Sequence, residues 1–304
     1  MQSKLIKSKI RAVAKTHQVT KAMEAVSAVK MRKAQERALL SRPFALSALS
    51  ILEHVSGAFD IQSHDLVKGR EVKKTLMIIV TSDRGLAGNH NNAILNKTIN
   101  HLKGVSKDVI QILPLGKKGF EYFSKRGWSI VAPHERMADF PTLQELEDVA
   151  RSVLLRFTEG AADEVSIAYT NLLSTFRQEP VVRRILPLDR AALRAVVSGI
   201  TPTQGKYATL YVRPEVEPTP YVFEPSAEEI FNELVSYLIS IFLYHGVLEA
   251  KASEFSARMM AMKNAGDKAV EVGKLLNRQF NRARQSVITR EVSEIIGGME
   301  TLSN

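Results

Sequence analysis

The chain contains no cysteine among its 304 residues, which excludes disulfide bonds, thiolate metal sites and regulation by thiol oxidation, and favours a reducing compartment. Its seven histidines are not spaced as metal ligands usually are. It also lacks the GxSxG motif of serine hydrolases, the GxGxxG turn of dinucleotide-binding proteins and a Walker lysine. We therefore predict no catalytic residue, no bound metal and no cofactor on this chain.

Long apolar runs are scarce as well. The most apolar long stretch, residues 237–250, includes His245 and falls short of the roughly 20 residues that a membrane-spanning helix needs. The first residues, MQSKLIKSKI, are basic, but no apolar signal core follows them, so we predict no targeting segment. The chain is expected to be soluble, or at most peripheral to a membrane.

Positive charge, by contrast, is abundant and unevenly placed. The formal net charge is +10, and residues 1–37 alone hold ten Lys and Arg against Glu24 and Glu36, a local net charge of +8. A purely solvated face would carry acid–base pairs four residues apart, which are nearly absent here. No aromatic residue precedes Phe44, which argues against binding of single-stranded nucleic acid. The pattern predicts an acidic partner, and composition leaves open whether it is nucleic acid, a membrane surface or a protein.

Helix-forming residues dominate both ends of the chain. From Ser3 to about Ser56 there is no glycine and one proline, Pro43, which predicts one helix that bends at Pro43 and continues. A second helix is predicted to begin at Ser226, an N-cap residue followed three positions later by a glutamate, as in a capping box. Its helical composition runs to the glycine pair 297–298.

The C-terminal helix carries a heptad pattern over about eight repeats, which is typical of a coiled coil. The recurring positions are Leu234, Ile241, Leu248, Phe255, Met262, Ala269, Leu276 and Ala283 in one series, and Leu238, His245, Ala252, Met259, Gly266, Gly273, Phe280 and Val287 in the companion series. The small residues Ala252, Gly266 and Gly273 would let a partner helix approach closely, although each glycine costs about 1 kcal/mol of helix propensity. A long helix interrupted by glycine requires such a partner.

The middle of the chain alternates between short apolar runs and helical patterns, which predicts a parallel α/β sheet. Strands are expected at 75–80, 109–115, 128–132, 164–169 and 181–186, and helices at 91–102, from 117 onward, and at 142–158. Residues 202–220, rich in Pro, Gly and Thr, indicate a loop that could include a strand at 208–212.

These elements predict a mixed α+β and α/β fold, in which a Rossmann-like α/β domain is inserted into a long antiparallel coiled coil of the two terminal helices. The expected divisions are residues 1–57 for the N-terminal helix, 70–222 for the α/β domain, and 226–297 for the C-terminal helix that pairs with the N-terminal one.

Because the two helices flank one compact insertion, they should run antiparallel from a common level, with the numbers of facing residues summing to about 283. Met23 then faces Met260, and the first residues of the N-terminal helix lie opposite about residue 280. Roughly 15–18 residues of the C-terminal helix would project beyond it, by roughly 25 Å at 1.5 Å per residue. That helix end has no predicted partner helix in the chain, so its apolar residues predict a socket in another protein. The end carries Val287, Ile288, Val292, Ile295 and Ile296 beside Arg282, Arg284 and Arg290.

One turn is placed as a phosphate-binding turn would be. Residues 82–88, SDRGLAG, follow a predicted strand and precede a predicted helix. The spacing of a nucleotide-binding motif is absent, so we favour a glycine-permitted strand-to-helix turn over a nucleotide site. A nucleotide-dependent enzyme is the alternative, and nucleotide binding by the isolated chain would support it.

Several segments resemble one known family, the gamma subunits of F-type ATP synthases. The matching segments are 6–13, 16–28 and 30–35 for the family's N-terminal helix, 252–265 and 281–298 for its C-terminal helix, and 82–88 and 221–225 between them. The similarity runs along the whole chain in the same order.

The resemblance implies a central-stalk rotor subunit without a catalytic site of its own, which couples ion-driven rotation of a c-subunit ring to ATP synthesis or hydrolysis in a proton-translocating complex. The implied partners are three alpha and three beta subunits, the epsilon subunit and the c ring, with no nucleic acid and no cofactor. The coiled coil would lie inside the alpha–beta ring, and the α/β domain would form a foot on the c ring. The implied location is peripheral, on the cytoplasmic side of a bacterial plasma membrane.

Motif matches also imply contact residues. Arg284, Gln285, Thr289 and Glu291 would make the bearing and catch contacts with beta, Met23 and Arg258 would lie lower on the shaft near an acidic beta segment, and Tyr221, Phe223 and Glu224 would lie at the foot. The family's turn usually carries a cysteine, then a second glycine and an aromatic residue, where this chain has Ala87, Asn89 and His90. The thiol control of chloroplast members is expected to be absent.

Overall fold

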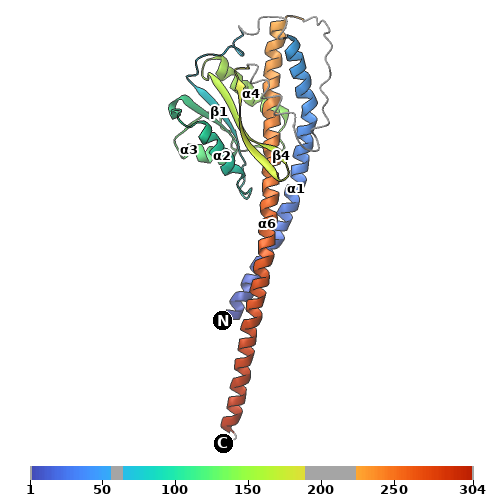
Figure 1. Ribbon diagram of the computed structural model, residues 1–304, viewed down its shortest axis with the longest axis vertical. Coiled ribbons are helices and arrows are strands. Elements are labelled where there is room, and N and C mark those ends of the chain that lie inside the picture. Colours follow the sequence, from blue (N-terminus) through green and yellow to red (C-terminus); the bar gives the residue numbers. More distant parts are fainter. Residues whose placement is uncertain (1, 56–63, 189–223, 303–304) are drawn as a thin grey trace. The chain divides into compact units, whose positions relative to one another are not determined.

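The computed structural model describes the chain apart from residue 1 and residues 56–63, 189–223 and 303–304 (Figure 1). The chain forms two compact units. The sheet unit comprises Ala28–Ala257, and the helical unit comprises Met1–Ser27 together with Arg258–Asn304. Two long helices, α1 (Gln2–Val55) and α6 (Ala227–Leu302), flank the α/β elements in the sequence as predicted, and each contributes residues to both units.

The sheet unit contains a five-stranded sheet in the order β3-β2-β1-β4-β5. Its strands are β1 (Thr75–Val80), β2 (Ile110–Leu115), β3 (Ser129–Ile130), β4 (Glu164–Ser174) and β5 (Arg177–Leu186). The first four are parallel, and β5 is antiparallel to β4. The expectation of a purely parallel sheet is therefore wrong at β5. Only Thr175 and Phe176 separate it from β4, whereas a parallel crossover needs about a dozen residues.

The connecting helices lie where the sequence predicts them. They are α2 (His90–His101), α3 (Lys117–Ser124) and α4 (Leu143–Thr158), with a 3-10 helix at Lys107–Val109. The Thr142 hydroxyl accepts a hydrogen bond from the Glu145 N–H at 3.3 Å, and the Glu145 carboxylate accepts one from the Thr142 N–H at 3.0 Å. This capping box fixes the start of α4. The strand considered at 208–212 lies outside the described residues.

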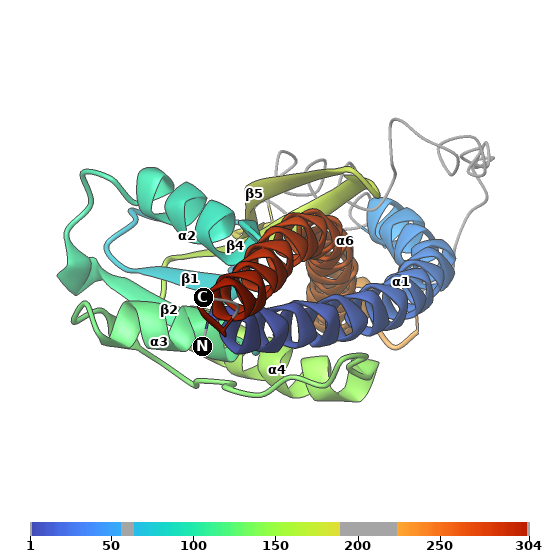
Figure 2. The same ribbon diagram turned by 90° about the horizontal axis from the view of Figure 1, so that it is seen from below.

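Apolar side chains cover both faces of the sheet. Successive residues of β1 alternate between the faces, so that Leu76 and Ile78 enter one core while Met77 and Ile79 enter the other. The first core is closed by α4 and α6, and the second by α2 and by Phe123 of α3. Figure 2 shows α2 and α4 on opposite sides of the sheet.

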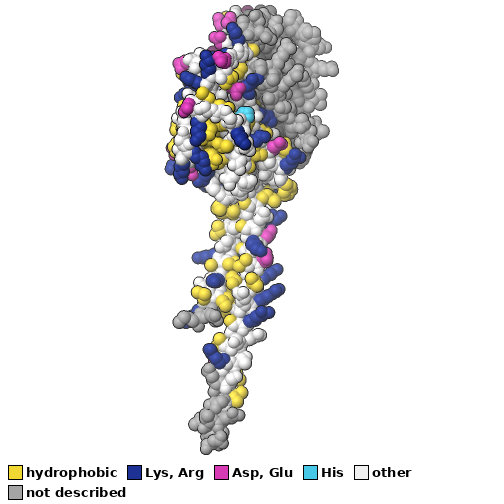
Figure 3. Space-filling view, turned by 60° about the vertical axis from the view of Figure 1, so that its left-hand side comes forward, with side chains coloured by type: hydrophobic (Ala, Val, Ile, Leu, Met, Phe, Trp, Pro, Cys, Tyr) yellow, Lys and Arg dark blue, Asp and Glu magenta, His cyan; other side chains and the backbone are white. Residues whose placement is uncertain are grey.

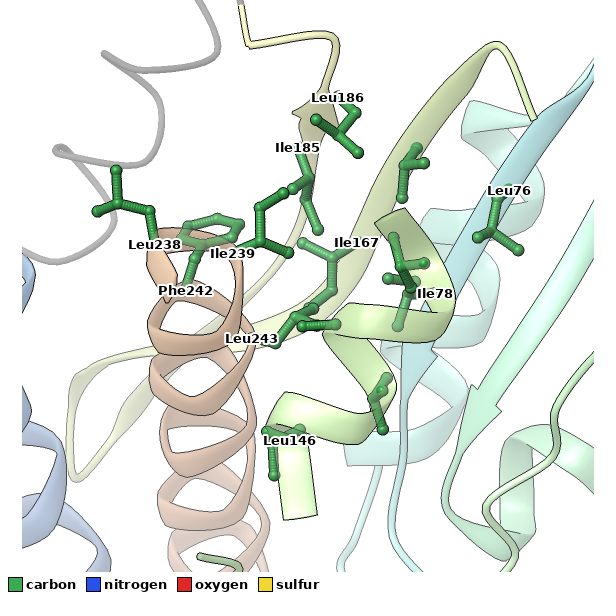
Figure 4. Close-up of a cluster of buried hydrophobic side chains, with 14 of the residues drawn as sticks. Leu76, Ile78, Leu146, Ile167, Ile185, Leu186, Leu238, Ile239, Phe242 and Leu243 are labelled. Atoms are coloured by element: carbon green, nitrogen blue, oxygen red, sulfur yellow. The ribbon is translucent and has the colours of Figure 1, made fainter. Parts of the chain in front are cut away.

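Within the first core, α6 covers β4 and β5. Ile239 and Leu243 of the helix lie against Ile167 and Ile185 of these strands, and all four side chains are almost completely buried (Figure 4). An 18-residue window of this helix is apolar enough, by length and composition, to cross a membrane, but 61% of the window is buried within the protein. The sheet that the helix covers explains its apolar character.

The ends of the long helices partly follow the prediction. α1 continues through Pro43, and the Ser226 hydroxyl accepts a hydrogen bond from the Glu229 N–H at 3.2 Å at the start of α6. α6 does not end at Gly297 and Gly298 but continues to Leu302. Each glycine lowers helix propensity by about 1 kcal/mol, which weakens a helix without ending it.

In the helical unit, α1 and α6 pair in antiparallel directions along the predicted seam. His17 Nδ1 lies 3.2 Å from the carbonyl oxygen of Gly266, which matches the predicted sum of 283 for facing residues. The Cβ position of Gly266 is 3.3 Å from Thr20 Oγ1, and that of Gly273 is 3.8 Å from Val13 Cγ1. The prediction that small residues permit close approach is confirmed at Gly266, whereas the contact at Gly273 is of ordinary length.

Candidate functional site

The last turns of α6 extend beyond the start of α1 in the helical unit (Figure 1). With His17 opposite Gly266, the first helical residue, Gln2, is level with about residue 281. About 20 residues of α6, or about 30 Å, therefore have no helical partner within the described chain. The apolar side chains of this segment are exposed by 37% to 64%: Val287, Ile288, Val292, Ile295 and Ile296. Several exposed apolar side chains on an unpaired helix end are typical of a contact with another molecule.

The implied beta-contact residues of this segment are accessible. Arg284, Gln285, Thr289 and Glu291 are all exposed and lie within two turns of α6, which spans about 11 Å. The two residues implied for the lower shaft differ from them, because Met23 is half-buried and Arg258 is only 7% exposed. The structure therefore brings the first four together on one accessible helix end and gives Arg258 little surface of its own.

The α1 segment of the helical unit is strongly basic. Lys4, Lys7, Lys9, Arg11 and Lys15 are all exposed. Figure 3 shows Lys and Arg side chains at intervals along the helical part of the molecule, with few acidic side chains among them. Five like charges within three turns raise the local positive potential, which favours an acidic partner.

The polar groups of the turn after β1 form hydrogen bonds with neighbouring loops of the sheet unit. The Asp83 carboxylate accepts hydrogen bonds from the N–H of Lys117 at 3.0 Å and of Met137 at 3.1 Å. The Asn91 side chain accepts from the Ser82 N–H at 3.0 Å and donates to Ser82 Oγ at 2.7 Å. These bonds join the loops that follow β1, β2 and β3 and give the turn a structural role. They occupy the carboxyl edge of the sheet, where doubly wound folds bind ligands.

The residues at which this turn departs from the family pattern are accommodated by the fold. Ala87 is 3% exposed and His90 is 6% exposed, and Asn89 is the N-cap residue of α2. Leu86, between Gly85 and Ala87, adopts a φ of 64°, in the left-handed region that non-glycine residues rarely enter. The turn is therefore tightly constrained by its neighbours.

A buried ionic cluster beside this turn was missed by the sequence analysis. The Lys251 ammonium of α6 lies 3.5 Å from Glu254 Oε2 and 4.0 Å from Asp83 Oδ2, and the side chains of Lys251 and Glu254 are 3% and 6% exposed. We call Asp83, Lys251 and Glu254 the ionic joint. In the heptad pattern, positions 251 and 254 lie outside the seam. If α6 packed against one partner helix alone, both side chains would be exposed to solvent. In the folded chain the turn after β1 brings Asp83 against Lys251, and both helix residues are buried.

The α1 helix reaches the same region through the loop before α4. Lys30 Nζ lies 2.5 Å from Asp139 Oδ2, and the Arg37 guanidinium lies over the Phe140 ring at 4.9 Å. Burial alone would raise the pKa of Asp139, but the hydrogen bond and charge of Lys30, with the charges of Lys251 and Arg84, hold this pKa below its usual value. The loop is thus attached to α1 and lies within the electric field of α6.

The β4–β5 hairpin attaches to α6 through serine hydroxyls. Ser253 Oγ donates to the Thr170 carbonyl at 3.0 Å, and Ser256 Oγ donates to the Thr175 carbonyl at 2.5 Å. Gln178 Nε2 donates to Ser256 Oγ at 3.2 Å. Small side chains at 253 and 256 let the hairpin backbone approach the helix directly.

A second buried titratable group, the pair of His245 and Glu249, lies before the ionic joint on α6. His245 Nε2 is 3.2 Å from Glu249 Oε1, and both side chains are nearly inaccessible. Burial, and then the charge of Glu249, raise the pKa of the Tyr169 hydroxyl well above its usual range. Tyr169 therefore stays neutral and serves as a core residue. Within the described residues, no three His, Asp or Glu side chains form a group that could hold a metal ion.

The implied foot residues are only partly placed. Tyr221 and Phe223 lie outside the described residues, and Glu224 is exposed just before α6. The structure therefore positions the helical contact residues and leaves the foot contacts as an expectation.

Comparison with known proteins identifies close relatives. A family model described as ATP synthase matches residues 2–302. An ATP synthase gamma chain of Desulforamulus reducens is 36% identical over 297 residues, covering 98% of each chain, and one of Methylobacillus flagellatus is 38% identical over 300 residues, covering 97% of this chain and 98% of the relative.

Solved structures show the same fold. A chain of the central stalk and c ring of the Tetrahymena thermophila mitochondrial ATP synthase is 25% identical, with a TM-score of 0.56, and the match covers 81% of this chain and 99% of that one. A chain of the Euglena gracilis mitochondrial ATP synthase is 17% identical, with a TM-score of 0.61, and the match covers 99% of this chain and 94% of that one. The second likeness is of fold alone.

Proposed function

The chain belongs to the gamma-chain family of ATP synthases, and from this membership we propose that it is the central-stalk rotor subunit of an F-type ATP synthase. It couples ion-driven rotation of a c-subunit ring to ATP synthesis or hydrolysis on a hexamer of three alpha and three beta subunits. The chain itself is a non-catalytic subunit of this proton-translocating complex.

The observation that carries this proposal is the projecting end of α6. About 30 Å of helix with exposed Val and Ile side chains has no partner within the described chain, so it requires a socket of matching shape. An alpha–beta ring that surrounds the shaft supplies such a socket. Arg284, Gln285, Thr289 and Glu291 are the accessible polar residues of this end and are proposed to make the bearing and catch contacts with beta.

The basic segment of α1 supports an acidic protein partner. We assign the exposed lysines and Arg11 to the surroundings of an acidic segment of beta, with Met23 and Arg258 lower on the shaft. Because the Arg258 side chain is only 7% exposed, we expect it to support the shape and the positive charge of the shaft surface more than to contact beta directly. Electrostatic attraction of this kind is screened by salt over about 8–10 Å.

The α/β domain is proposed to form the foot on the c ring and to bind the epsilon subunit, with Tyr221, Phe223 and Glu224 at the c-ring contact. In functional terms, residues 1–57 and 226–297 form the shaft and 70–222 the foot. Bacterial relatives indicate a membrane-associated complex. We propose a peripheral position on the cytoplasmic side of the bacterial plasma membrane.

The test is co-expression of the chain with the alpha and beta subunits of the same organism, followed by gel filtration and an ATPase assay. One copy is expected to co-elute with each hexamer. Arg284→Ala and Gln285→Ala are expected to lower the ATPase activity without preventing assembly, because they remove contacts on an exposed helix end. Lys118→Ala, on α3 of the sheet unit, serves as the control.

Three outcomes would overturn the proposal. Unchanged ATPase activity in both the Arg284→Ala and the Gln285→Ala variant would show that these residues make no functional contact with beta. A chain that elutes alone and binds or hydrolyses nucleotide would instead be an enzyme, and a chain whose affinity for nucleic acid falls with salt, with a logarithmic slope near −0.9 per phosphate contact, would be a nucleic-acid-binding protein.

A further inference from the structure

Lys251 is an unusual residue at its position on α6. Its side chain is 3% exposed, and its neighbours along the same helix include fully buried apolar residues such as Leu248 and Phe255. Taking an ammonium group out of water costs several kcal/mol, which its carboxylate partners only partly offset. An apolar residue of similar length would fill the space at lower cost. A gain in folding stability therefore does not explain the charge of Lys251. The charge is better explained by the way it orients α6 against its neighbours.

The partner of Lys251 on the sheet is rigidly held. Asp83 accepts hydrogen bonds from two backbone N–H groups, those of Lys117 and Met137, so its carboxylate cannot follow a movement of α6. Glu254 lies three residues after Lys251 on the same face of the helix, and its carboxylate is 3.5 Å from the ammonium. The ammonium is thus fixed between the helix and the carboxyl edge of the sheet.

The remaining contacts of α6 with the sheet differ in kind. Ile239, Leu243 and Gly246 pack against the sheet through apolar surface, which is non-directional and tolerates small rotations of the helix. An ion pair with a buried ammonium tolerates them less, because rotation separates the charges and leaves Lys251, 3% exposed, with little water, even though Asp83 is 22% exposed. The directional contacts lie within 251–256, where Ser253 and Ser256 also bind the hairpin.

We propose that the ionic joint of Asp83, Lys251 and Glu254 fixes the rotational setting of α6 against the sheet, so that torque acting on the α/β domain turns the helix without slip. This assignment rests on the proposed rotor function. Lys251 is a positioning residue: it touches neither nucleotide nor the coupling ion, and it acts through the helix that carries it.

The test compares coupling with stability in the complete, membrane-reconstituted complex. Lys251→Met keeps the length of the side chain and removes the charge, and Lys251→Met combined with Glu254→Gln also neutralises the partner. The two readouts are ion pumping per ATP hydrolysed and the unfolding midpoint of the purified chain, followed by the fluorescence of Trp128. Lys118→Met is the matched control, since Lys118 and Glu121 form an ion pair of the same spacing, 2.8 Å apart, on a partly exposed helix.

Both Lys251 variants are expected to assemble and hydrolyse ATP but to lose most of their pumping per ATP, while the control pumps like the wild type. The double variant is expected to unfold at or near the wild-type midpoint, because replacing a buried ion pair by neutral groups is often neutral for stability. A double variant of normal stability that also pumps normally would overturn the joint. Failure of the wild-type chain to assemble or to support pumping would instead overturn the rotor function.

Discussion

The two segments of α6 share one heptad pattern but are buried in different ways. In the sheet unit, the helix is enclosed by the sheet, α4 and the β4–β5 hairpin, and even Lys251 and Glu254 are inaccessible. In the helical unit, it packs on α1 along a narrow seam through Gly266 and then continues with its apolar residues exposed. The comparison shows that a heptad pattern locates a contact stripe without identifying what covers the rest of the helix.

The largest effect should come from removing core volume in the enclosed segment. Leu243→Ala deletes a fully buried side chain that packs toward Ile167, and such a change usually costs about 2–5 kcal/mol. Trp128, the only tryptophan of the chain, lies against Phe123 in the second core, with ring centroids 5.6 Å apart. Its fluorescence during urea unfolding therefore measures the stability of the sheet unit.

Leu275→Ala is the matched control on the same helix. Leu275 is 54% exposed in the helical unit, so its loss is expected to change stability by less than about 0.5 kcal/mol. Equal effects of the two substitutions would show that α6 is covered to the same extent in both units, and the comparison would fail.

A smaller loss of stability is expected when one hydrogen bond between α6 and the β4–β5 hairpin is removed. Ser253→Ala removes a buried hydroxyl that donates to the Thr170 carbonyl at 3.0 Å, which should cost about 1 kcal/mol in the Trp128 transition. Ser286→Ala, on the exposed end of α6, should leave that transition unchanged. A Ser253→Ala variant as stable as the wild type would show that apolar packing alone holds the hairpin on the helix.

The sequence was sufficient for features that depend on local pattern. The seam register, the N-cap at Ser226 and the projecting end of α6 follow from spacing and composition, and the structure confirms them. The antiparallel direction of β5 was not predicted, because a pattern of apolar residues does not indicate in which direction a strand pairs. The two-residue connection to β4 determines that direction. The ionic joint was missed because Asp83 and Lys251 are 168 positions apart in the sequence and meet only through the folded sheet.

The glycines of the seam offer a gain in stability. Gly273→Ala should stabilise the helical unit by about 0.5–1 kcal/mol, because its Cβ position is 3.8 Å from Val13, an ordinary contact, and alanine favours the helix. Gly266→Ala should gain less or lose stability, because its Cβ position is only 3.3 Å from Thr20 Oγ1. Hydrogen exchange of the amides of residues 258–280 measures both, and equal protection in the two variants would contradict the close approach at Gly266.

The smallest effect concerns the ion pair between α1 and the loop before α4. Lys30 holds the pKa of Asp139 below its usual value, so the pair contributes stability above the unfolded pKa, near 4, and loses it as the pH falls through the lower folded value. Because these side chains are 30% and 40% exposed, Asp139→Asn should cost about 0.2–1 kcal/mol at pH 7. The difference from wild type should shrink below about pH 4, where the wild-type carboxylate becomes protonated.

The control for this last prediction lies on α1 in the helical unit. Lys21 and Glu24 form an ion pair at 3.2 Å within one helix, with Lys21 68% exposed. Glu24→Gln should leave the Trp128 transition unchanged at every pH, because this pair connects α1 only to itself. A pH-independent cost of Asp139→Asn would mean that the loop is held by the Phe140 contacts with Arg37 and Phe255, and that the charge of Asp139 adds nothing to the attachment of α1 to the sheet unit.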